Sequence, residues 1–262
     1  MGAKAAKYLL VYRDERFSPG AVERDKAMLD AVGQMLSEGG KHSLFYIHEH
    51  ELETVNAADY ADCTIVHMTR SAEALTKIAQ MQSLGARVLN EPQAILRCQR
   101  AYIEEVMMAN GLPTPTTLIE KCPELSGKGW WIKSNETTDS TPSHIQFCET
   151  LSTDFSESDA AKSGKLLVQP HIEGQNIKFY GVRNTDFFHV RESISTAVLQ
   201  QLCTAADTLA AALSLDIYGG DAILTAANHL TIIDFNDFPS FSSCRKEAAE
   251  AIFCAVRQIK NH

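Results

Sequence analysis

The segment GGDAILTAANHLTIIDFNDFPSF, residues 219–241, contains two short apolar runs separated by the polar tetrapeptide AANH. Runs rich in Ile, Leu and Thr on either side of a four-residue loop predict an antiparallel pair of strands. The register that pairs Thr225 with Leu230 also places Asp221 opposite Asp234. Directly opposed residues have Cβ atoms about 4.5–5.5 Å apart. The hairpin is therefore predicted to bring two carboxylates together.

The same register places Ile223 opposite Ile232, and it leaves the two opposed carboxylates to repel each other unless something compensates. Asn236 lies two residues after Asp234, so an extended backbone turns both side chains to one face. Two carboxylates and an amide oxygen suit Mg²⁺, which shares its other coordination positions with water and substrate phosphates. The alternative is that Asp234 and Asn236 only begin a turn before the next proline. The opposition of Asp221 favours the metal.

The first ninety residues alternate between strand-like and helix-like patterns. Apolar residues at helical spacing predict helices over AVERDKAMLDAVGQMLSEGG and over SAEALTKIAQMQSLG, with Ser71 as the N-cap of the second. Strand-like runs lie around them: KYLLVY, SLFYIH, DCTIVHM and ARVLN. This alternation predicts a small parallel α/β domain. It carries no G-x-G-x-x-G and so gives no sign of dinucleotide binding.

The rest of the chain reads as α+β with mainly antiparallel pairing. EPQAILRCQRAYIEEVMMANG predicts one helix and LPTPTTLIE an extended connection. Two further helices are predicted, STAVLQQLCTAADTLAAALSL before the hairpin and SSCRKEAAEAIFCAVRQIK after it. Five strand-like runs precede them: WWIKS, HIQFCE, LLVQPHI, NIKFYGV and DFFHVRE.

The net charge and the cysteine pattern limit the partners and the cellular compartment that this protein is expected to have. The net charge of −9 and pI of about 5.5 argue against a nucleic-acid or anionic-membrane binder. Seven cysteines without a C-x-x-C motif predict free thiols in a reducing compartment. No signal peptide is evident, and no run approaches the roughly 20 apolar residues of a membrane span. We therefore expect a cytoplasmic protein, and the sequence leaves a homodimer open.

The order of these segments resembles the ATP-grasp superfamily. A helix ending ANGLPTPTT is followed by a strand with Lys133, then LLVQPHIEG, NIKFYGV and GGDAIL…IIDFNDFP. The last segment is similar to the acidic and Asn-x-x-Pro ending that binds Mg-ATP in that superfamily. The implied fold is an α/β N-terminal domain followed by α+β ATP-grasp domains, whose mixed, mainly antiparallel sheets clasp a nucleotide. The implied units are a pre-ATP-grasp domain at 1–90, a helix and small central subdomain at 91–166, and a C-terminal subdomain at 167–262.

The resemblance also implies roles for the acids and for one lysine. Asp221, Asp234 and Asn236 would hold one or two Mg²⁺ between the nucleotide phosphates, and Lys133 would contact the α- and β-phosphates of ATP. Judged without the resemblance, Lys133 lies beside two tryptophans, so it either extends to solvent or reaches a partner.

The remaining implied roles belong to two neighbouring strands. The backbone of VQPHI would read the adenine, Glu173 would meet the ribose, and Lys178 and Arg191 would act on the transferred phosphoryl group. The implied nucleotide-binding residues of this stretch are Gln169, His171, Ile172, Glu173 and Lys178.

Three functions from different classes stay open. Most of the superfamily consists of carboxylate–amine ligases, which pass through an acyl phosphate. The DFNDFP ending resembles inositol-phosphate kinases, but a polyphosphate acceptor needs a dense cationic cluster, and this chain is acidic. The segment SNETTDSTPSH lacks the glycines with which the superfamily usually cradles phosphates. The third open function is therefore a nucleotide-binding protein without catalytic activity. We prefer a ligase for a small-molecule acceptor, with Arg97, Arg100 and Arg245 on the acceptor side.

Overall fold

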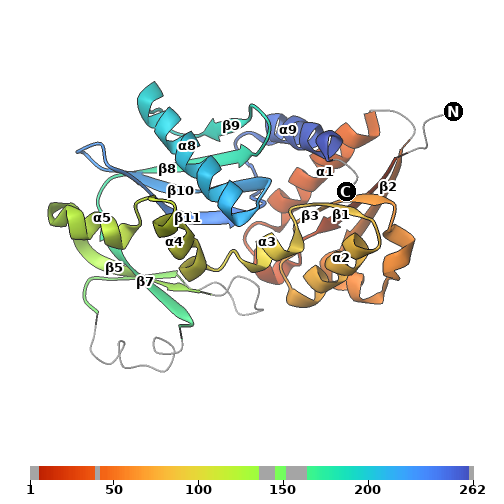
Figure 1. Ribbon diagram of the computed structural model, residues 1–262, viewed down its shortest axis with the longest axis horizontal. Coiled ribbons are helices and arrows are strands. Elements are labelled where there is room, and N and C mark those ends of the chain that lie inside the picture. The colour runs from red at the N-terminus through yellow and green to blue at the C-terminus, as the bar shows by residue number, and fades with distance from the viewer. Residues whose placement is uncertain (1–5, 39–41, 136–144, 152–163, 260–262) are drawn as a thin grey trace.

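The computed structural model describes residues 6–38, 42–135, 145–151 and 164–259. Three sheets follow one another along the chain. A parallel sheet belongs to the N-terminal unit, a small antiparallel sheet to the middle of the sequence and a larger antiparallel sheet to its end (Figure 1). In Figure 1 the N-terminal unit lies to the right, and the central strands β5 and β7 lie below the C-terminal strands β10 and β11.

The N-terminal unit is a parallel sheet with helices on both faces, as the sequence predicts. Its strands have the order β2-β1-β3-β4. Helix α1 packs in the core on one face and α2 in the core on the other. The elements are β1 (Lys7–Tyr12), α1 (Val22–Glu38), β2 (Ser43–His48), β3 (Cys63–His67), α2 (Ala72–Ser83) and β4 (Arg87–Leu89), with short 3-10 helices η1 (Glu15–Phe17), η2 (Glu49–Thr54) and η3 (Ala57–Tyr60).

The helical segment that follows differs from the prediction of one helix. It consists of α3 (Pro92–Leu96) and α4 (Arg100–Ala109), with Gln99 extended between them. The break occurs because Asn135, from a distant part of the chain, binds the start of α4. Its carbonyl accepts from the backbone N–H of Arg100 and its side chain accepts from that of Ala101.

The predicted extended connection LPTPTTLIE is also wrong in part, because it contains helix α5 (Pro115–Lys121). Thr114 and Thr117 form a reciprocal cap at the start of α5, and Pro115 occupies the first turn. The two prolines of this segment suggested an extended chain, but the cap and a proline in the first turn favour a helix. A short 3-10 helix, η4 (Pro123–Leu125), leads into the central sheet.

Two antiparallel sheets form the rest of the molecule. The central sheet has the order β6-β5-β7 and the C-terminal sheet the order β11-β10-β8-β9. Helices α8 (Thr196–Leu213) and α9 (Arg245–Gln258) pack on the C-terminal sheet. The strands are β5 (Ser126–Ser134), β6 (Ile145–Cys148), β7 (Leu166–Ile172), β8 (Gln175–Val182), β9 (Phe188–Val190), β10 (Ile217–Leu224) and β11 (Leu230–Asp237).

The hairpin β10–β11 opposes its two acids, but not through the predicted register at its loop. Asp221 pairs with Asp234, whereas Leu224, not Thr225, pairs with Leu230, and Ile223 faces Thr231. The register shifts beside Asp221. One extra residue on the edge strand β11, Ile233, accounts for the shift. The expected pairs of Thr225 with Leu230 and Ile223 with Ile232 are therefore wrong, while the opposition of the acids is confirmed.

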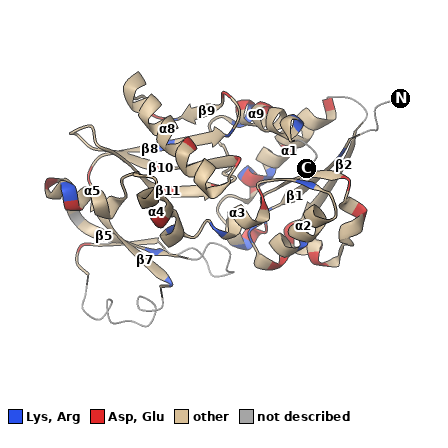
Figure 2. Ribbon diagram, in the orientation of Figure 1, with Lys and Arg blue, Asp and Glu red and all other residues tan. Residues whose placement is uncertain are grey.

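The N-terminal unit shares one hydrophobic core with the C-terminal sheet. Met28 and Leu29 of α1 belong to the same buried cluster as Phe238, Phe241 and the apolar face of α9. A second cluster joins α4 and α8 to the inner face of the C-terminal sheet. The division of the chain at residues 90 and 166 stays a prediction. Acidic and basic residues are interspersed along the helices of the N-terminal unit (Figure 2). No helix among the described residues is long and apolar enough to cross a membrane.

Candidate functional site

A cavity of about 350 Å³ lies between the central and the C-terminal sheet. Most of the residues singled out in the sequence for nucleotide or metal binding line it. From the central sheet and its neighbours come Pro115, Trp131, Lys133, Ile145, Gln169, Pro170, His171, Ile172 and Gly174, and from the C-terminal sheet come Asn176, Asp221, Ile223, Ile233 and Asp234.

The acidic side of the cavity is built by the hairpin. Asp221 and Asp234 are directly opposed, and the side-chain amide of Asn236 donates to Asp234 Oδ2 at 2.9 Å. Burial raises the pKa of Asp221, and the nearby Asp234 adds to this effect. Among the described residues no three His, Cys, Asp or Glu side chains gather as a metal site. The donor set of two carboxylates and one amide suits Mg²⁺ only if phosphate or water oxygens complete it.

Lys178 lies beside Asp221 in the sheet. The pair is in register between β8 and β10, and Lys178 Nζ lies 3.1 Å from Asp221 Oδ2. The ammonium opposes the rise in the pKa of Asp221. Lys178 is 42% exposed, so its side chain can leave the carboxylate without crossing packed protein.

Lys133 spans the cavity from the central sheet to the hairpin. Its Nζ donates to the carbonyl of Ile233 at 2.8 Å, and the residue is only 5% exposed. Burial lowers the pKa of Lys133, and the carboxylate of Asp234 opposes that lowering. The sequence left open whether Lys133 extends to solvent or reaches a partner. In the structure its ammonium reaches a partner, the carbonyl of Ile233.

Strand β7 forms the opposite wall. His171 Nδ1 accepts the indole N–H of Trp131 at 3.1 Å. Because indole nitrogen only donates, the imidazole proton is on Nε2. Gln169 is buried and its amide donates to Glu104 on α4 at 2.5 Å. Ile172 is buried, and Glu173 follows β7 as an exposed residue outside the cavity lining.

The predicted phosphoryl-side arginine lies next to β8. Arg191 follows β9, is exposed, and donates its backbone N–H to the carbonyl of Lys178 at 3.2 Å. The neighbouring Glu192 accepts the backbone N–H of Lys178 at 2.7 Å. The side chain of Arg191 is not among those lining the cavity, so its assigned role stays a prediction.

Arg100, a candidate for the acceptor side in the sequence, lies beside Asp234. Its Nε lies 3.5 Å from Asp234 Oδ1 and its Nη1 donates to the carbonyl of Ser134 at 2.5 Å, and its acceptor-side role stays a prediction. It therefore joins Asp234 to the strand end from which SNETTDSTPSH begins. Residues 136–144 of that segment lie outside the described part of the chain. Arg97 is exposed, and Arg245 begins α9.

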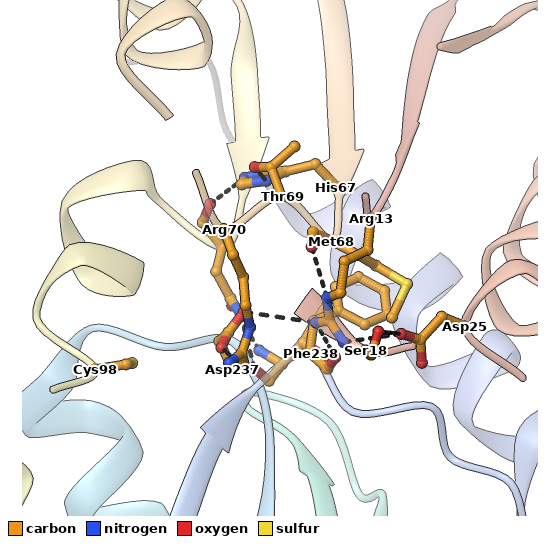
Figure 3. A network of polar contacts seen from close by, with 12 residues as sticks. Arg13, Ser18, Asp25, His67, Met68, Thr69, Arg70, Cys98, Asp237 and Phe238 are labelled. Atoms are coloured by element: carbon orange, nitrogen blue, oxygen red, sulfur yellow. Dashed lines mark hydrogen bonds and ion pairs between the residues drawn. The ribbon is translucent and has the colours of Figure 1, made fainter. Parts of the chain in front are cut away.

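A buried ionic network joins the end of β11 to the N-terminal unit (Figure 3). Arg70 Nη2 lies 2.5 Å from Asp237 Oδ1, and Arg13 Nη2 donates to the carbonyl of Phe238 at 3.0 Å. Arg13 also pairs with the buried Asp25 at 3.0 Å. The network fixes the strand end directly after Asn236. Asp237 was not predicted from the sequence, where its only signal is that strand alternation places it on the opposite face from Asn236.

No protein-family model matches the sequence, and no curated protein matches it either. Solved structures match over nearly the whole chain. D-alanyl-alanine synthetase A from Vibrio cholerae is 10% identical with a TM-score of 0.70, covering 97% of this chain and 98% of its own. A RimK domain ATP-grasp protein from Sphaerobacter thermophilus is 15% identical with a TM-score of 0.63, covering 97% and 99%. D-alanine–D-alanine ligase from Bacillus anthracis, solved with ATP, is 10% identical with a TM-score of 0.65, covering 97% and 95%. At these identities the likeness concerns the fold, and it confirms the predicted fold class.

Proposed function

We propose that this chain, which has the ATP-grasp fold, binds Mg-ATP between its central and C-terminal sheets and uses it to join a carboxylate to an amine. The observation that carries the proposal is the composition of one cavity. It places the opposed acids Asp221 and Asp234 and the buried Lys133 within reach of an aromatic and apolar wall. A base needs such a wall, and a triphosphate needs the cations and a metal.

The nucleotide is proposed to lie across the cavity from β7 to the hairpin. The apolar wall with Ile172 and the Trp131–His171 pair suits the adenine, and backbone groups of β7 at its edge suit the ring nitrogens. Lys133 and Arg100 then lie on the phosphate side, next to Asp234. Asp221, Asp234 and Asn236 would hold Mg²⁺, which supplies charge neutralisation between the phosphate oxygens when bound.

The proposed reaction has two steps. A carboxylate oxygen of the acceptor forms a bond to the γ-phosphorus while the bond to the β-phosphate oxygen breaks, and ADP leaves. An amine then attacks the acyl carbon, inorganic phosphate leaves, and the amine proton passes to solvent. Lys133, Arg100 and Lys178 would act by neutralising charge on the transferred group, because phosphoryl transfer depends mainly on positioning and electrostatics. Arg191 is proposed to join them from the loop after β9.

A ligase is preferred over a kinase on the basis of the structural neighbours. They include ligases named for D-alanine and D-alanine or D-serine, and an ATP-grasp ligase solved with a minimal precursor, Mg and ADP. The acceptor of this chain is accordingly proposed to be a small molecule with a carboxylate. We also propose that the protein works in the cytoplasm, where its seven free cysteines stay reduced.

Trapping the acyl phosphate tests the proposal. ADP release would be followed with a panel of amino acids, including D-alanine, in the presence of hydroxylamine, which converts an acyl phosphate into a hydroxamate. We expect hydroxamate and ADP in equal amounts from the wild type and none from Asp234→Asn. Asp216→Asn is the matched control, because Asp216 pairs with Arg183 outside the cavity. ADP formed with polyols and without hydroxamate would make the protein a kinase instead.

A further inference from the structure

We propose that β2 pairs with β2 of a second copy of this chain, in antiparallel orientation about a two-fold axis at Phe45. This inference is independent of the proposed enzymatic activity. It starts from the position of β2, which is an outer strand of the N-terminal sheet. All six of its residues pair in register with β1, from Lys7 with Ser43 to Tyr12 with His48, so the strand is straight and carries no bulge.

The outer edge of β2 presents free backbone groups. The N–H of Ser43 donates toward β1, to the carbonyl of Ala6 at 3.0 Å. Because alternate residues of a strand turn their N–H and C=O groups to opposite edges, Leu44, Tyr46 and His48 face outward. The N–H of His48 is bound by Glu51 at 2.7 Å. Within the described part of the chain, the outward groups of Leu44 and Tyr46 have no partner.

Two aromatic side chains of this edge are exposed. Phe45 is 40% exposed on one face of the sheet and Tyr46 is 46% exposed on the other. The segment His42–His48, HSLFYIH, contains no Asp, Glu, Lys, Arg or Pro. Proteins usually guard an edge strand with a charge, a proline, a bulge or a very short length, since an unguarded edge pairs with another chain.

The other edge strands of this molecule have features that prevent pairing with another chain. Strands β4 and β9 are three residues long and β6 is four. Strand β7 contains Pro170, and β11 contains the bulge at Ile233. Only β2, among the edges that the structure describes, combines six residues, a straight register and exposed aromatic side chains. The contrast indicates that this edge is covered in solution.

The pattern of outward groups selects a symmetric partner. If Leu44 of one copy forms the hydrogen-bonded pair with the partner's Tyr46, then Tyr46 forms the same pair with the partner's Leu44. Phe45 then meets the partner's Phe45 at a non-hydrogen-bonded position, where Cα atoms are about 4.5 Å apart. The outward groups of Leu44 and Tyr46 in both strands are satisfied by this one register. Such an isologous contact closes with two copies.

The first test of the proposal is the oligomeric state of the protein in solution. Sedimentation equilibrium should show a dimer for the wild type and a monomer for Phe45→Lys, because two ammonium groups would face each other on the axis. Leu84→Lys is the matched control: Leu84 is 50% exposed at the end of α2, so its replacement should leave the dimer intact. Circular dichroism would confirm that each variant is folded.

Disulfide trapping tests the register itself. Phe45→Cys should form an intermolecular disulfide on mild oxidation, since residues on the axis lie within disulfide reach. Ser43→Cys should not, since Ser43 faces the partner's Ile47. A monomeric wild type would overturn the proposal, including the case in which the edge binds a strand of a different protein. A dimer that persists in Phe45→Lys, or that crosslinks equally through residue 43, would overturn it as well.

Discussion

At the scale of single residues, Lys133 is the buried charge on which the proposed nucleotide site most depends. Its charge is buried against the carbonyl of Ile233, and burial lowers its pKa. A buried ammonium with one neutral acceptor contributes little to folding, because desolvation offsets the hydrogen bond. A bound anion, such as a phosphate group, would compensate the cost of burying this ammonium.

Replacing Lys133 by Met should therefore separate binding from stability. The free energy of unfolding should change by less than about 1 kcal/mol, since the lost hydrogen bond and the relieved desolvation nearly cancel. The affinity for Mg-ATP should fall at least tenfold, which is about 1.4 kcal/mol. Urea titration and calorimetry would measure the two effects. Equal affinity in Lys133→Met would remove this lysine from the nucleotide site.

His67 gives a prediction about acid stability. The ring is fully buried, and burial lowers its pKa to about 4. Its Nε2 donates to the carbonyl of Asn90 at 2.8 Å, so its Nδ1 accepts from the Thr69 hydroxyl at 2.6 Å. Above pH 6.5 the imidazole is neutral in both states. As the pH falls, the unfolded chain takes up the proton first, so stability should drop between pH 6.5 and about 4, by roughly 3 kcal/mol.

The contribution of His67 can be isolated by substitution. His67→Gln should lower stability at neutral pH but flatten the pH dependence between pH 6.5 and 4, whereas His50→Gln, at an exposed ring, should leave the slope as in the wild type. Urea unfolding at several pH values measures this. An unchanged slope in His67→Gln would assign the acid sensitivity to other groups.

At the scale of elements, local patterns predicted most of the fold and missed what distant contacts decide. Helix α2 begins at its predicted cap, Ser71, because the signal is local. The break between α3 and α4 could not be read from the sequence, since it depends on Asn135. The bulge at Ile233 was equally hidden. It restores the opposition of Asp221 and Asp234 that the loop register alone would have shifted, so this opposition was predicted correctly on a partly wrong register.

The Thr114 cap of α5 is a local signal that the prediction of an extended chain missed. Its contribution to stability can be tested directly. Thr114 is buried, and its hydroxyl accepts the backbone N–H of Thr117 at 3.2 Å. Thr114→Ala should cost about 1 kcal/mol of unfolding free energy, while Thr114→Ser should cost much less, because serine keeps the capping oxygen. Thr208→Ala, on the exposed side of α8, serves as the control and should change stability by less than about 0.5 kcal/mol. Equal stability of the Ala and Ser variants would show that the cap does not stabilise α5.

At the scale of the whole molecule, the end of β11 is held by two arginines from the N-terminal unit. Asp237 is 2% exposed and contacts both Arg70 and Arg13. Asp234 and Asn236, on the other face of the same strand, are thereby fixed relative to the N-terminal unit, with which the strand end also shares a hydrophobic core. Distances between elements so far apart in sequence could not be predicted from the sequence.

Removing this carboxylate should be far more costly than removing a surface one. Asp237→Asn removes the carboxylate that pairs with Arg70, whose side chain is 15% exposed, and with the buried Arg13, and we expect a loss of about 3 kcal/mol in unfolding free energy. Asp62→Asn, in the exposed pair with Lys7, should cost less than 1 kcal/mol. In Asp237→Asn combined with Arg70→Met the losses should be less than additive. Full additivity in the double variant would show that the two residues do not interact in solution.

The proposal that the cavity is a Mg-ATP site depends most directly on one measurement. Calorimetric titration of ATP would be made with and without Mg²⁺ on the wild type, Asp221→Ala and the control Asp216→Asn. We predict that the wild type and the control bind ATP in a Mg²⁺-dependent manner and that Asp221→Ala loses this dependence. Equal binding by Asp221→Ala, or no binding of ATP by the wild type, would contradict the assignment and leave the opposed acids with a structural role.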